Sequence, residues 1–78
     1  MEDKKSIKHN NFKRIVEKRV QNTLNEMERI RKCANTYNYY YEEKEVSKII
    51  QELNKKIREI KTEFDRGLSK QLRKKFKL

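Results

Sequence analysis

The chain has 78 residues, 44% of them charged, with no Pro, a single Gly and a formal net charge of +10. This length allows one domain with a thin core, and the composition favours long exposed helices over a sheet. One Cys and one His are too few for a structural zinc site or an intramolecular disulfide, so we expect no metal and no cofactor.

The composition also bears on location. No apolar run approaches the ~18 residues of a membrane-spanning helix. The first residues, MEDKKSIKHNN, lack the apolar centre of a signal peptide. The single thiol, Cys33, suits a reducing compartment. We therefore expect a cytoplasmic protein.

Residues 1–10 are polar and charged and show no helical period. We expect a frayed, basic arm there. Asn10 or Asn11 is a suitable N-cap for the helix that follows, because its side-chain oxygen can accept from a free backbone N–H.

A first helix is predicted over residues 11–35. Its apolar positions step by four and three residues alternately, which is the 3.5-residue period of a coiled-coil seam. Thr23 is the polar member of that seam. The seam residues are Val16, Val20, Thr23, Met27, Ile30 and Ala34.

A tyrosine-rich turn is predicted over residues 36–42. Asn35 can end a helix in the left-handed conformation, and Asn38 suits a turn. The four tyrosines could stack on bases or fold over the open end of a helix pair and cap its core. We favour the structural role, because no Lys or Arg lies between Lys32 and Lys44 to hold a phosphate backbone.

A second helix is predicted over residues 43–66, with the same period. Glu52–Lys56 here, and Glu28–Lys32 in the first helix, are spaced as i,i+4 ion pairs. The seam residues are Val46, Ile50, Leu53, Ile57, Ile60 and Phe64.

Residues 67–78 form a basic amphipathic extension. Gly67 interrupts the pattern, and the apolar residues Phe64, Leu68, Leu72 and Phe76 then recur every four residues, so their stripe drifts around the helix. We expect the helix to continue past Gly67, bent or rotated. Leu68, Leu72 and Phe76 are therefore candidate partner-binding residues.

Two amphipathic helices joined by a short turn predict an all-α fold, an antiparallel two-helix hairpin with coiled-coil-like packing. Each helix has only one narrow apolar face, and two such helices cannot cover both stripes fully. We therefore expect a homodimer that forms a four-helix bundle.

Three segments support this prediction by their likeness to known sequences: EKRVQNTL, YNYYYEEKEV and KIIQELNKKIREIKTEF. With them the chain resembles a family of short, uncharacterised bacterial helical-hairpin proteins with an E-x-R-V-x-x-x-L helix, an N-Y-x-Y turn and a second amphipathic helix. Glu42 stands where that family tends to place Thr. The resemblance implies a fold and carries over no functional residue.

The residues for catalysis are missing from the pattern. His9 lies in the polar arm, Cys33 has no second His to pair with, and one glycine cannot make a phosphate-binding loop. We expect no enzyme activity and no small-molecule substrate.

Charge is segregated along the chain. Residues 1–20 carry +4, residues 21–65 carry 0 and residues 66–78 carry +6. In an antiparallel hairpin the two basic ends meet at one pole, and a patch of one sign is typical of polyanion binding. The candidate nucleic-acid-binding residues are Lys13, Arg14, Lys18, Arg19, Arg66, Lys70, Arg73 and Lys74.

Three functions fit this pattern. The first is binding of nucleic acid, RNA or DNA, or of a ribonucleoprotein, through backbone charge and shape. The alternative is an adaptor or inhibitor, of the kind that a phage or plasmid encodes, docking through Leu68, Leu72 and Phe76. The third, an interfacial membrane helix, is the least favoured because the C-terminal apolar segment is short.

Overall fold

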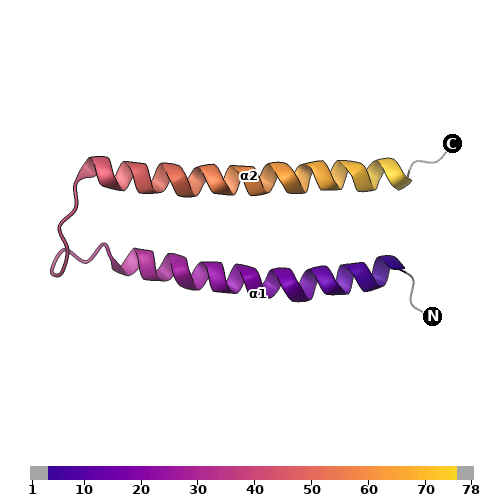
Figure 1. Cartoon of the computed structure of the whole chain (residues 1–78), viewed down its shortest axis with the longest axis horizontal. Coiled ribbons are helices and arrows are strands. Elements are labelled where there is room, and N and C mark those ends of the chain that lie inside the picture. Colours follow the sequence, from indigo (N-terminus) through magenta and orange to yellow (C-terminus); the bar gives the residue numbers. More distant parts are fainter. Residues whose placement is uncertain (1–3, 76–78) are drawn as a thin grey trace. The chain divides into compact units, whose positions relative to one another are not determined.

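The computed structural model describes the backbone of residues 4–75 and the side chains of residues 4–72. Within that range it contains two α-helices, α1 (Lys4–Lys32) and α2 (Glu43–Lys75), and no strand (Figure 1). The predicted all-α class is confirmed. The chain divides into two units, Met1–Tyr40 and Tyr41–Leu78, each of which contains one helix.

Helix α1 begins earlier than its seam indicates. It starts at Lys4, so the prediction of a frayed arm is wrong from that residue on, and Met1–Asp3 lie outside the described residues. Asn10 and Asn11 lie inside the helix and do not cap it. The reason is local: no Gly or Pro interrupts residues 4–11, and lysine is a good helix former.

Helix α1 also ends earlier than predicted, at Lys32. The amides of Cys33 and Ala34 donate to the carbonyls of Ile30 and Arg31, at 2.9 and 3.1 Å, which tightens the last turn. Asn35 then accepts a hydrogen bond at its Oδ1 from the backbone N–H of Tyr37, at 2.9 Å. No non-glycine residue in the described range has a positive φ, so the predicted left-handed Asn35 is wrong. An Asx turn replaces it.

Helix α2 starts at Glu43, where the sequence predicts it. The backbone N–H of Glu42 donates to Oε1 of Glu45, at 2.8 Å, which is one half of a capping box. Glu43 and Glu45 lie in the first turn, where the positive end of the helix dipole favours carboxylates. The side chain of Glu45 therefore provides the cap at the start of this helix, and Glu42 takes part through its backbone N–H.

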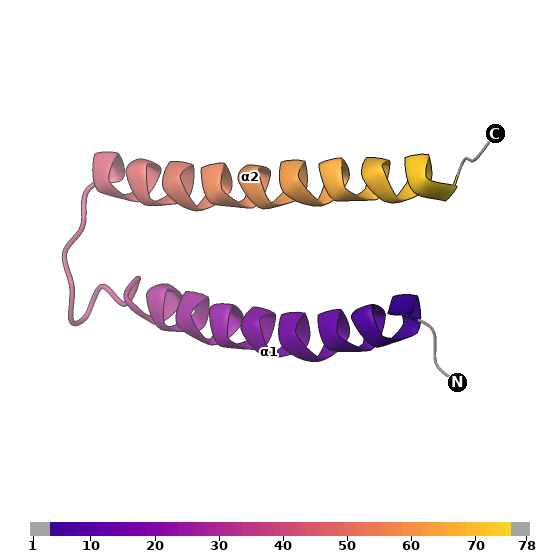
Figure 2. The same cartoon turned by 45° about the vertical axis from the view of Figure 1, so that its right-hand side comes forward.

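Helix α2 runs through Gly67 without a break. Position 67 lies within the bounds of α2, and Figures 1 and 2 show this helix as one continuous ribbon. The predicted continuation past Gly67 is confirmed. The separate role of residues 67–78 stays a prediction. Gly67 is part of the helix, and its φ is not positive. A glycine inside a helix lowers the stability of the helix by about 1 kcal/mol relative to alanine.

The apolar stripes of both helices lie at the surface. No side chain of the described range is buried, and the most covered apolar residues, Val16, Met27 and Leu53, are only half-buried. The apolar stripe of each helix therefore remains uncovered within its own unit. Over the described residues, neither helix contains a stretch long and apolar enough to cross a membrane.

Candidate nucleic-acid interface

The candidate basic residues of α1 do not share one face. An α-helix turns by about 100° per residue, which places Arg14 and Lys18 together, about 40° apart. By the same geometry Lys13 and Arg19 lie about 120° to either side of that pair. These four exposed side chains therefore surround α1.

The candidate basic residues of α2 are more focused. Arg66 and Lys70 are exposed on neighbouring turns. The helical register places positions 66, 70, 73 and 74 within an arc of about 100°. The backbone of Arg73 and Lys74 is helical, and their side chains lie outside the described residues. The structure thus brings the α2 candidates onto one side of their helix.

Ion pairs are concentrated in the middle of the chain. Arg29 pairs with Glu26, Arg31 with Glu28, Lys56 with Glu59 and Lys61 with Asp65. Of the candidates, Arg66 alone among the described residues has an ion-pair partner, Glu63 at 2.9 Å. Lys13, Arg14, Lys18, Arg19 and Lys70 make no ion pair within the described range. Their charges are therefore available to an external anion.

The internal pairs differ from the predicted i,i+4 pairs. Lys56 lies 2.9 Å from Glu59 instead of pairing with Glu52, and Arg31, not Lys32, donates from Nε to the Glu28 carboxylate at 3.0 Å. Hydrogen bonds from these partners lower the pKa of Glu28 and of Glu59, and the bond to Glu59 raises the pKa of Lys56. All these groups are exposed, so the pairs contribute little to stability.

The candidate partner-binding stripe is exposed as well. Leu68 and Leu72 expose 56% and 67% of their surface. Phe76, the third member, lies outside the described residues. The two leucines are about 40° apart on consecutive turns and so form one small apolar patch.

The tyrosines divide into two classes. Tyr37 and Tyr40 expose 93% and 87% of their surface, whereas Tyr39 and Tyr41 are more covered. Within its own unit, neither Tyr37 nor Tyr40 packs over a core, and the expected capping of a helix pair stays a prediction. Backbone bonds to Asn35 from Asn38 and Tyr39 hold this part of the turn in place.

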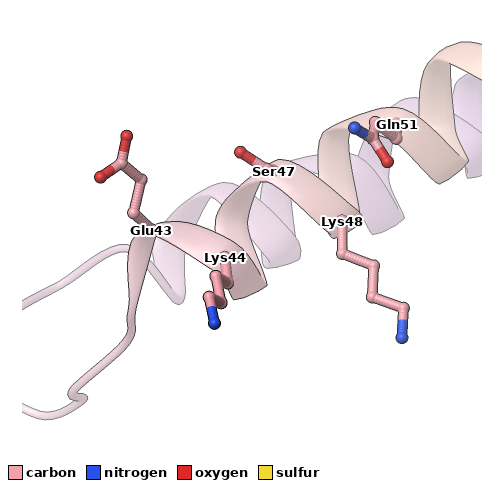
Figure 3. A pocket seen from close by; sticks show the side chains of 5 residues that line it. All are labelled: Glu43, Lys44, Ser47, Lys48 and Gln51. Atoms are coloured by element: carbon pink, nitrogen blue, oxygen red, sulfur yellow. The ribbon is translucent and has the colours of Figure 1, made fainter.

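No feature of the described residues resembles a small-molecule or metal site. No group of three or more His, Cys, Asp and Glu in that range could hold a metal ion. A hollow on α2 is an open stretch of helix surface, and Figure 3 shows Lys44 and Lys48 extending from the same side, away from Glu43. The residues that line it are Glu43, Lys44, Ser47, Lys48 and Gln51.

The chain was compared with known protein families, curated proteins and solved structures. No protein family, curated protein or solved structure matches the chain. The resemblance to a hairpin family therefore stays a prediction, and the function must be argued from the residues themselves.

A second group of basic residues lies on α2, within a segment whose net charge is zero. Lys44, Lys48, Lys55 and Arg58 belong to the electrically balanced middle and were not among the predicted site residues. They lie on the side of α2 opposite its apolar stripe, within an arc of about 80°. This group becomes visible when each charged residue is placed at its angle around the helix axis, because residues of one sign then fall on one side.

Proposed function

We propose that this protein binds nucleic acid, RNA or DNA, or the nucleic-acid surface of a ribonucleoprotein. Binding acts through backbone charge and shape. The observation that carries the proposal is the set of exposed basic side chains that have no carboxylate partner among the described residues: Lys13, Arg14, Lys18, Arg19 and Lys70. Residues 66–78 add Arg73 and Lys74 and contain no acid at all.

Unpaired basic residues are the chemistry that such a ligand needs. Each lysine or arginine that neutralises a phosphate releases a condensed counterion, and this release drives binding without reading sequence. Arg14 and Lys18 can act together because they are neighbours on one face of α1. An internally paired residue such as Lys56 must first give up its glutamate, and so contributes less.

The proposal includes an assembly. The two helices pair as an antiparallel hairpin, which brings the basic ends to one pole, and two hairpins form a homodimeric four-helix bundle. The exposed apolar stripes on both helices support this assembly. An amphipathic helix is marginally stable alone and gains most of its stability when its apolar face packs against a partner. Ile57, in the middle of the α2 stripe, is 53% exposed and thus available to such a partner.

A second candidate function is supported by the exposed patch of Leu68 and Leu72. In this alternative the chain is an adaptor or inhibitor that docks the patch, together with Phe76, on a larger protein. Its binding would depend on apolar burial and would change little with salt.

Two variants separate the candidates. The first replaces Lys70, Arg73, Lys74 and Lys77 with Gln and keeps the apolar stripe. The second replaces Leu68, Leu72 and Phe76 with Gln and keeps the charge. If charge carries function, the first variant loses affinity about equally for all sequences and shows a shallower salt dependence, and the second binds as the wild type does.

The measurement is fluorescence anisotropy with labelled DNA and RNA, titrated from about 50 mM salt, where electrostatic binding is strongest. Helicity by circular dichroism checks that both variants remain folded. Failure of the wild type to bind any DNA or RNA under these conditions would make the nucleic-acid proposal wrong and leave the adaptor.

A further inference from the structure

The charge of α2 is arranged in lengthwise bands. With about 100° per residue, the apolar stripe occupies one side, and the opposite arc of about 80° contains no acid. We call that arc the basic face of α2. Within the described residues it consists of Lys44, Lys48, Gln51, Lys55, Arg58, Thr62, Arg66 and Ser69.

The acids of α2 lie between these two bands. Glu45, Glu52, Glu59 and Glu63 follow one border of the basic face, and Glu43 and Asp65 follow the other. Three of them hold basic residues in ion pairs: Lys56 with Glu59, Lys61 with Asp65 and Arg66 with Glu63. Lys44, Lys48, Lys55 and Arg58 make no ion pair within the described range. Apart from Arg66, the cations of the basic face therefore have no carboxylate partner within that range.

The position of the acids distinguishes two polyanions. A helix that lies on an anionic membrane brings the borders of its apolar stripe close to the lipid headgroups. In α2 Lys56 and Lys61 lie next to the stripe, but both are held in ion pairs, and among the described residues the acids between the stripe and the basic face outnumber the basic residues there. These flanks therefore offer anionic headgroups no net positive charge. A ligand that approaches from the opposite side meets lysine, arginine and hydrogen-bond donors such as Thr62 and Ser69. The arrangement favours a nucleic acid, whose phosphates accept from such groups.

The basic residues on this side also have a regular spacing. They form three pairs: Lys44 with Lys48, Lys55 with Arg58, and Arg66 with the adjacent Lys70. At a rise of 1.5 Å per residue, successive pair centres lie about 16 and about 17 Å apart. A turn of duplex DNA is about 34 Å long and contains two strands, so phosphate ridges recur on average about every 17 Å along its side.

We propose that the basic face of α2 lies along the outside of a double-stranded nucleic acid, with each of its three basic pairs on a phosphate ridge. The unbroken course of α2 through Gly67 keeps the third pair in line with the other two. The inference rests on the proposed nucleic-acid binding. It adds the form of the ligand, a duplex, and four contact residues: Lys44, Lys48, Lys55 and Arg58.

The test compares two variants that each remove four positive charges. The face variant replaces Lys44, Lys48, Lys55 and Arg58 with Gln. The control variant replaces Arg29, Arg31, Lys56 and Lys61 with Gln, which removes the same charge from residues held in ion pairs outside the basic face. Affinity for a 24-base-pair duplex, and for one of its single strands, is measured by anisotropy over a salt series.

The face variant should lose on the order of 100-fold or more in duplex affinity at about 0.1 M salt, with a salt slope smaller by about three to four. The control variant should lose much less. A third variant splits the middle pair and places one charge nearer to each neighbouring pair on the same face, with Lys55→Gln, Arg58→Gln, Gln51→Lys and Thr62→Lys. Its net charge is unchanged, and it should still bind the duplex more weakly than the wild type.

Each outcome decides between the claims. Equal losses in the face and control variants would mean that net charge alone matters and would overturn the basic face. Equal binding of duplex and single strand, or an undiminished third variant, would overturn the fit to phosphate ridges. Loss on replacing Lys13, Arg14, Lys18 and Arg19, with a normal face variant, would overturn this inference and leave the proposed function intact. If the wild type binds neither duplex nor single strand, both the proposed function and this inference are wrong.

Discussion

Helices α1 and α2 share a helical period but not a charge layout. In α1 the basic side chains surround the helix, and a hydroxyl, that of Thr23, lies within the apolar stripe. In α2 the stripe is continuous, the acids border it, and the unpaired basic residues gather on the opposite side. The difference teaches that α2 has two separate surfaces. One suits an apolar partner and the other an anionic ligand, whereas α1 has a weaker apolar stripe and basic residues that are not gathered on one side.

The largest effect is expected from a charge in the stripe of α2. Ile57→Asp places a carboxylate where we propose helix packing, which costs several kcal/mol if the site is dry, on the order of the values known for unpaired buried charges. Helicity should fall and the dimer should dissociate in sedimentation equilibrium. Thr62→Asp, on the side of the same helix opposite the stripe, is the control and should leave both unchanged. A monomeric, fully helical wild type would exclude the four-helix bundle.

The tyrosine turn comes next. Truncating the more covered rings, in Tyr39→Ala or Tyr41→Ala, should lower the melting temperature by several degrees, as expected for about 1 kcal/mol in a chain of this size. Tyr37→Ala, at an almost fully exposed ring, is the control and should not change it. If the rings stack on bases instead, the same variants should lose about 1–3 kcal/mol of affinity per stacked base and melt normally.

Gly67→Ala tests the continuity of α2. Gly67 is helical, and a Cβ added there meets nothing within 4 Å, so alanine should stabilise the protein by about 1 kcal/mol. Thermal melting followed by circular dichroism measures the gain. A loss of stability instead would show that a partner packs closely against Gly67 in the assembly.

Thr23→Val tests why the α1 stripe is the weaker one. The hydroxyl of Thr23 donates to the carbonyl of Arg19 at 2.8 Å, so its polarity is satisfied within its own helix. Valine has nearly the same shape and adds apolar area, and should raise stability by ~0.5 kcal/mol if the stripe is covered in the dimer. An unchanged melting temperature would place Thr23 outside the interface.

The smallest effect concerns pH. The pKa values of Glu28 and Glu59 are lowered by their hydrogen-bonding partners, so their contribution is present above the ordinary carboxyl pKa and is lost as pH falls through the lowered value. The pKa values of Lys56 and Lys61 are raised, so their contribution is lost only as pH rises through the raised value.

The two helices should therefore respond differently. Acid should weaken both slightly, whereas alkali should weaken α2 alone, because Arg31 keeps its proton. Residue-resolved NMR across the pH range can follow this, with Glu59→Gln removing the acid response in α2 only. Equal alkaline fraying of α1 would contradict the assignment of these pairs.

The candidate site was predictable in part. The terminal basic residues could be read from the sequence because they lie in segments with few or no acids. The basic face of α2 could not be seen in a count over residues 21–65, which sums to zero, because a helix sorts charge by angle and not by order. The pairing of Lys56 with Glu59 also escaped the sequence, since i+3 and i+4 neighbours both lie within reach of a long side chain.

The sequence by itself determined the helical class, the apolar stripes and the start of α2 at Glu43, because periodicity and capping are local properties of consecutive residues. Other features emerged only from the three-dimensional structure. Residues 4–11 extend α1 although they carry no apolar stripe, the Asn35 side chain forms the turn that follows that helix, and Gly67 stays helical. In each of these places several conformations differ by about 1 kcal/mol or less in local preference, and the neighbouring turns and hydrogen bonds select among them.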